Sequence, residues 1–182
     1  PWADAQGGVP DGEGGWTPVG PGTEPFAPHY RTPTALDAAG IAAVVDAFAA
    51  AATRALDAGF AAVEIHAAHG YLLHEFLSPL TNHRTDAYGG DRAGRMRLTL
   101  EVARAVRAAV GEDVPVLARI SSTDWVDGGW TVDDSVALAA ELAAAGVDLV
   151  DTSSGGISPA ARIPLGPGYQ VPAAARIRRE AG

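Results

Sequence analysis

Short apolar segments alternate with longer amphipathic ones from about residue 38 to residue 152, and this alternation limits the fold more than any other feature of the chain. The longer segments are residues 38–58, a stretch through Met96 and Val106, and residues 132–145, where apolar residues recur every three or four positions, as in helices. The short segments at 61–66, 114–120 and 147–152 are predicted strands. Strands that alternate with amphipathic helices form parallel βα units.

Parallel βα units build either a barrel or a doubly wound sheet. No Gly-x-Gly-x-x-Gly follows any predicted strand, so the dinucleotide-binding fingerprint of the doubly wound sheet is missing. A complete (β/α)8 TIM barrel needs about 250 residues. We therefore predict an α/β fold in which residues 34–182 form a partial (β/α)8 TIM barrel, roughly its middle βα units. We expect the chain to be an internal piece of a longer protein.

Residues 1–33 are rich in glycine and proline and show no helical or strand period. Four aromatic residues, Trp2, Trp16, Phe26 and Tyr30, are spread through this segment. We predict a long ordered loop or lid that precedes the barrel. A flexible chain end is the alternative that composition allows.

Composition narrows the choice of partners. The net charge of −9 argues against a nucleic-acid partner, which would need clustered Lys and Arg. The chain has no cysteine, so it supplies no disulfide, thiolate zinc site or iron–sulfur ligand, and we expect a cytoplasmic setting. The Ala-rich apolar runs are interrupted by Asp or Arg, which predicts no membrane span.

Three proton-handling side chains gather after the first predicted strand. Alternation puts Glu64 and His66 on the face that looks into the barrel, with His66 at the carboxyl end, where barrel enzymes place their active sites. His69 and Tyr71 follow in the next turn. Two imidazoles can hydrogen-bond an oxygen that gains negative charge, and a phenol can deliver a proton.

Two other interpretations of this stretch stay open. One histidine can be a structural residue and Tyr71 a core residue. Alternatively, Glu64, His66 and His69 are three potential metal ligands, as in a metal-dependent barrel hydrolase, although the His-Glu-x-x-His pattern of zinc proteases is missing.

Arg119 ends the second predicted strand. Burying a guanidinium costs free energy unless an anionic or acceptor group pairs with it. Arg119 therefore indicates that a ligand binds beside it. An ion pair with Glu64 or Asp124 is the structural alternative, and both interpretations can hold together.

These stretches together resemble the old yellow enzyme family, in its bacterial ene-reductase branch. The resemblance is carried by Glu64–Leu72, His74–Pro79 and Asn82–Gly90, and more weakly by Leu117–Ser121, Gly146–Leu149, Ser153–Gly155 and Pro167–Gln170.

The resemblance implies an FMN-dependent oxidoreductase that uses NADPH or NADH to reduce activated C=C bonds of small α,β-unsaturated carbonyl or nitro compounds. His66 and His69 would bind the substrate oxygen, Tyr71 would donate the proton, and Arg119 would contact the FMN ring. A homo-oligomer of the full-length parent is a further expectation. Because other FMN-binding parts of the family are missing, we expect the isolated chain to bind FMN poorly. A non-catalytic barrel remnant or binding module is the alternative.

Overall fold

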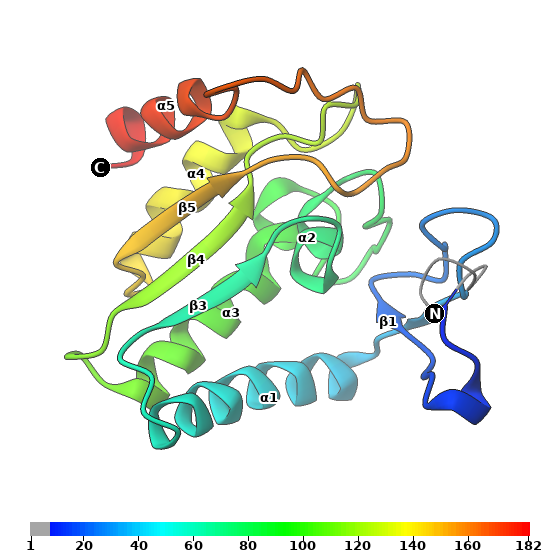
Figure 1. The fold of residues 1–182 in the computed structure, drawn as a ribbon, viewed down its shortest axis with the longest axis horizontal. Coiled ribbons are helices and arrows are strands. Elements are labelled where there is room, and N and C mark those ends of the chain that lie inside the picture. Colours follow the sequence, from blue (N-terminus) through cyan, green and yellow to red (C-terminus); the bar gives the residue numbers. More distant parts are fainter. Residues whose placement is uncertain (1–7) are drawn as a thin grey trace.

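The computed structural model describes residues 8–182; residues 1–7, and with them Trp2 of the predicted lid, lie outside the described residues. A parallel three-stranded sheet forms the centre, in the order β3 (Val63–Ala67), β4 (Val116–Ser121) and β5 (Leu149–Ser153). The principal helices are α1 (Ala38–Asp57), α3 (Arg92–Val110), α4 (Val132–Ala144) and α5 (Val171–Ala181). In Figure 1, α3 and α4 lie behind the sheet, while α1 runs beside α3 and α5 beside α4.

The predicted order of these helices and strands is confirmed, with boundaries shifted by at most two residues. The strands bury one face: Ile65 and Ala67 of β3 and Val116, Ala118 and Ile120 of β4 are almost inaccessible and join the core beneath the helices. The opposite face carries polar side chains at intervening positions. Inward and outward positions alternate as in a barrel strand, and the inner face carries Glu64, His66 and Arg119 beside the apolar Leu117.

Helix α1 has a side-chain cap at its N-terminus. Asp37 is the N-cap, because its Oδ1 accepts a hydrogen bond from the backbone N of Gly40 at 2.7 Å. Thr34 lies in β2 (Thr34–Ala35). Gly59, with φ 92°, follows the end of the helix in the left-handed region, a conformation that glycine adopts readily.

Helix α1 corrects one expectation. It is long and apolar enough to cross a membrane by length and composition, contrary to the prediction from its internal charges. One such helix is weak evidence for a membrane span. Here α1 packs along α3, and its residues Ile41 and Ala52 are buried.

The sequence prediction contained no helix between β3 and α3, yet α2 (Leu72–Leu77) lies there. Six residues are too few to display a helical period. Leu73, Phe76 and Leu77 of α2 are buried, so the helix is a core element that holds the carboxyl end of β3.

The glycine- and proline-rich segment is mostly irregular from residue 8 to 33. It includes a short 3-10 helix, η1 (Asp11–Glu13), and β1 (Val19–Gly20), which pairs in parallel with β2. The chain before residue 34 is therefore joined by backbone hydrogen bonds to the chain just after it. Strand β1 also contacts α2.

Glu75 of α2 lies where β1 approaches: a Cβ added at Gly20 would be 3.3 Å from Glu75 Oε2. Burial raises the pKa of Glu75 to about 7. The unfolded chain ionises this carboxyl near its ordinary value, so stability is lost as pH rises from about 4.5 to 7. We expect Glu75→Gln to be more stable than wild type by about 2 kcal/mol at pH 8, after allowance for solvent screening.

The measurement is urea unfolding of both proteins between pH 4 and pH 8. The gain should shrink as pH falls and vanish below the unfolded pKa. Glu112→Gln, at an exposed position, is the control and should show no such pH-dependent gain. A constant difference at every pH would contradict the assignment of this effect to Glu75 ionisation.

Candidate active site

The turn after β3 brings together the three side chains that the sequence singled out. The ring centroids of His66 and His69 are 5.1 Å apart, and those of His66 and Tyr71 are 5.3 Å apart. The side chain of Tyr71 is 63% exposed, so a ligand can reach its hydroxyl. The alternative that Tyr71 is a core residue is therefore wrong.

His69 adopts a backbone conformation that few residues other than glycine tolerate, with φ 59°. Such a conformation costs about 1–3 kcal/mol and persists only where neighbouring groups enforce it. Here the backbone N of His69 donates to Ser121 Oγ at 3.0 Å, and that hydroxyl donates to the carbonyl of Gly155 at 2.8 Å. The ends of β3, β4 and β5 are thus tied together beneath His69.

Two glycines allow this turn and the loop after β5 to meet backbone to backbone. A Cβ at Gly70 would lie 2.1 Å from the carbonyl oxygen of Gly156, and a Cβ at Gly156 would lie 2.5 Å from Cα of His69. Both distances are well inside van der Waals contact. The place of His69 therefore depends on a glycine 87 positions further along the chain.

Gly156→Ala should push this loop away from His69. Both a clash and a positive φ of 95° oppose the new side chain, and we expect a loss of about 3 kcal/mol in the free energy of unfolding. Gly128→Ala is the matched control, because Gly128 has φ 76° but no atom within 4 Å of an added Cβ. Equal losses in urea unfolding for the two variants would contradict a role for the close approach.

Arg119 lies beside His66 on the open face of the sheet, in register with His66 on β3 and Asp151 on β5. Its guanidinium contacts Glu64 Oε1 at 2.9 Å and Asp151 Oδ2 at 2.6 Å. The predicted ion pair with Glu64 is confirmed. The alternative pair with Asp124 is wrong, because Asp124 is fully buried in the loop after β4 and bonds to other groups.

The electrostatic surroundings keep both imidazoles neutral near pH 7. Burial, followed by the positive charge of Arg119, lowers the pKa of His66. Burial, followed by the proximity of His66, lowers the pKa of His69. A neutral imidazole carries one N–H donor and one acceptor nitrogen, so each ring can donate one hydrogen bond.

The His69 ring is held by Ser153, the last residue of β5, since His69 Nε2 and Ser153 Oγ are hydrogen-bonded at 2.5 Å. In the sequence, Ser153 and Ser121 belong only to stretches that carry the family resemblance, and neither has a predicted role. Their positions at the carboxyl ends of β5 and β4 were the available signal, because parallel strands bring those ends together.

The metal interpretation concerns Glu64, His66 and His69. Residues 8–182 contain no group of three His, Cys, Asp or Glu side chains placed to hold a metal ion. Of the three proposed ligands, Glu64 is bound by Arg119 and His69 by Ser153.

Polar side chains at the carboxyl ends of parallel strands, over an apolar face covered by helices, define a site of the βα-barrel enzyme class. Residues 13–170 match the model of the NADH:flavin oxidoreductase / NADH oxidase family. The chain belongs to this family, and the resemblance inferred from the sequence is confirmed.

Individual relatives agree with this family assignment. The chain is 48% identical over 147 residues to an NADH:flavin oxidoreductase of Gibberella zeae, a match that covers 74% of this chain and 36% of the relative. It is 47% identical over 163 residues to an NADPH dehydrogenase of Geobacillus sp., covering 90% of this chain and 47% of the relative. The chain thus spans half or less of the length of these relatives.

Solved structures show the same architecture. A 2-naphthoyl-CoA reductase in complex with 2-naphthoyl-CoA superposes with a TM-score of 0.82 at 32% identity, over 90% of this chain and 26% of the other. Morphinone reductase in complex with tetrahydroNAD superposes with a TM-score of 0.73 at 28% identity, over 94% of this chain and 48% of the other. The prediction of a partial barrel is confirmed.

The site also fits the flavin that the family name implies. Arg119 presents a guanidinium on the open face, 39% exposed, beside two neutral imidazoles. In the adjoining loops, Ser154 Oγ and Trp125 Nε1 are buried without a hydrogen-bond partner among the described residues. A planar ring with hydrogen-bonding groups along its edge, such as a flavin, is suited to the Arg119 guanidinium, the two imidazoles and these buried polar atoms.

Proposed function

We propose that the protein is an FMN-dependent oxidoreductase that uses NADH or NADPH to reduce activated C=C bonds of α,β-unsaturated carbonyl or nitro compounds. The observation that carries the proposal is the grouping of His66, His69 and Tyr71 at the carboxyl end of β3, next to Arg119. Its partners are small molecules, and we place it in the cytoplasm.

The two histidines suit the recognition of a substrate oxygen. Reduction of a conjugated C=C bond leaves enolate-like negative charge on that oxygen, and fixed donors lower the free energy of the charged species. The ring centroids of His66 and His69 are 5.1 Å apart, and His69 Nε2 is hydrogen-bonded to Ser153 Oγ. With the Ser153 hydroxyl as the donor in that bond, the N–H of His69 is on Nδ1 and can donate to the substrate oxygen. A donor pair that is already in place needs no reorganisation as charge develops.

Tyr71 suits the delivery of a proton. Its ring packs near His66, and the residue is largely exposed, so its hydroxyl could lie over the carbon next to the carbonyl or nitro group. General acid catalysis of this kind contributes about 10²–10⁴-fold in rate.

Arg119 would hold the edge of the flavin ring. FMN, when bound, supplies the hydride transfer that side chains cannot perform. Glu64 contacts Nε and Asp151 contacts one terminal nitrogen of the guanidinium. Because a guanidinium carries five N–H donors, Arg119 could still donate to one more electron-rich group.

The proposal is tested by a visible absorption spectrum of the complete reading frame that encodes this chain, after mixing with FMN and desalting. The expected result is a yellow flavin band that bleaches with NADPH under argon and returns when cyclohexenone is added. A folded protein that stays colourless would overturn the proposal. It would favour the binding-module alternative.

A further inference from the structure

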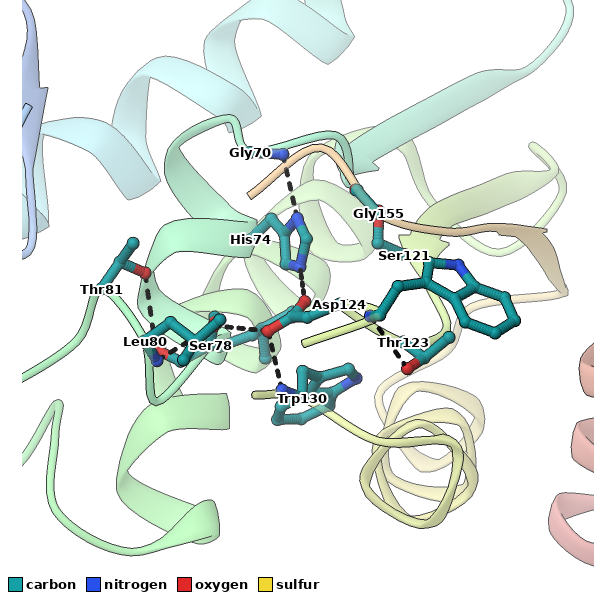
Figure 2. A network of polar contacts seen from close by, with 12 residues as sticks. Gly70, His74, Ser78, Leu80, Thr81, Ser121, Thr123, Asp124, Trp130 and Gly155 are labelled. Atoms are coloured by element: carbon teal, nitrogen blue, oxygen red, sulfur yellow. Dashed lines mark hydrogen bonds and ion pairs between the residues drawn. The ribbon is translucent and has the colours of Figure 1, made fainter. Parts of the chain in front are cut away.

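A buried polar network lies directly beneath the His69–Tyr71 turn (Figure 2). His74 of α2 and Asp124 of the loop after β4 are its centre, and both are 0% exposed. His74 Nε2 lies 2.8 Å from Asp124 Oδ1. Asp124 Oδ2 also accepts from Ser78 Oγ at 2.6 Å and from the backbone N of Trp130 at 2.7 Å.

The other nitrogen of His74 points to the turn. The backbone N of Gly70 donates to His74 Nδ1 at 2.9 Å. A nitrogen that accepts cannot carry a proton, so His74 is the neutral tautomer with its proton on Nε2, which donates to Asp124. The orientation of the ring is therefore set by Asp124, and the ring in turn sets the amide of Gly70.

Gly70 is the residue between His69 and Tyr71. Its φ is 77°, and its backbone N donates to His74 Nδ1 at a part-buried position. Ser121 holds the amide of His69 and His74 holds the amide of Gly70, so two successive peptide groups are fixed from below. A change in either support would rotate the peptides that carry the two side chains.

We propose that His74, oriented by Asp124, is a positioning residue that holds the His69–Gly70–Tyr71 turn in its working geometry through the Gly70 amide. The inference rests on the proposed function for its effect on turnover. Asp124 is held by Ser78 and by the backbone N of Trp130. Among the described residues, His74 alone connects Asp124 to the Gly70 amide by hydrogen bonds.

Two substitutions separate the halves of this link. In His74→Asn, the side-chain oxygen takes the place of Nδ1 and can still accept from Gly70. In His74→Gln, the side-chain nitrogen takes the place of Nε2 and can still donate to Asp124, but no acceptor is left for Gly70. Each variant loses one buried hydrogen bond, so a merely structural role predicts similar effects for both.

The first readout is amide hydrogen exchange at Gly70 in flavin-free protein, with the complete reading frame. We expect His74→Asn to keep the protection of Gly70 and His74→Gln to lose it at least about tenfold, in keeping with a lost hydrogen bond. The second readout is enone reduction by the FMN-loaded protein. His74→Gln should lower kcat about 30-fold, because the His69–Gly70–Tyr71 turn would shift away from its working position. His74→Asn should retain most of the wild-type kcat.

The outcomes are distinct. Equal exchange at Gly70 in the two variants would overturn the positioning role, whether or not the protein is an ene-reductase. Loss of Gly70 protection with an unchanged kcat would also overturn it, because the turn would then move without consequence. Wild-type protein with no activity but the expected exchange pattern would refute the proposed function and leave the hydrogen-bond link intact.

Discussion

Tyr71→Phe is expected to lower kcat for enone reduction by about 10²–10⁴-fold, because it removes the proposed proton donor and nothing else. The side chain is 63% exposed, so loss of its hydroxyl leaves no buried group without a partner. Substrate binding through His66 and His69 should persist, so KM should change far less than kcat. Steady-state kinetics with cyclohexenone and NADPH would measure both constants.

Tyr30→Phe is the matched control, since Tyr30 is 48% exposed but lies in the segment before β2. It should leave kcat within about twofold of wild type, as surface substitutions do. If Tyr71→Phe retained full kcat, another group or water would be the proton donor.

Asp124→Asn is expected to give the largest loss of stability among the substitutions considered, about 3–5 kcal/mol. The carboxylate accepts from His74, from Ser78 and from the backbone of Trp130, all without contact with water. An amide of the same shape has one acceptor oxygen and places its own N–H groups against a donor. Buried donors are then left unpaired, each at a cost of about 1–3 kcal/mol.

The measurement is the urea midpoint and slope at pH 7. Asp127→Asn serves as the control, because Asp127 lies in the same loop but is exposed, and it should change stability by less than about 0.5 kcal/mol. A similar small change for Asp124→Asn would mean that the network is not a source of stability.

The secondary structure was largely predictable because it depends on local patterns. Helices α1, α3 and α4 show an apolar residue every three or four positions, and β4 contains Arg119, as predicted. Helix α2 and the pairing of β1 with β2 were missed, because elements of six and two residues carry too little periodicity. Their existence depends on contacts with distant segments.

Within the site, the sequence by itself determined the residue types and their order: His66 at a strand end, with His69 and Tyr71 in the following turn. It also determined the parallel βα arrangement that brings strand ends together. The sequence left Glu64 and Asp124 open as partners of Arg119. Only the tertiary structure decided for Glu64, added Asp151, and paired Asp124 with His74. The reason is physical: hydrogen bonds between residues 50 or more positions apart depend on packing and register, which local periodicity does not encode.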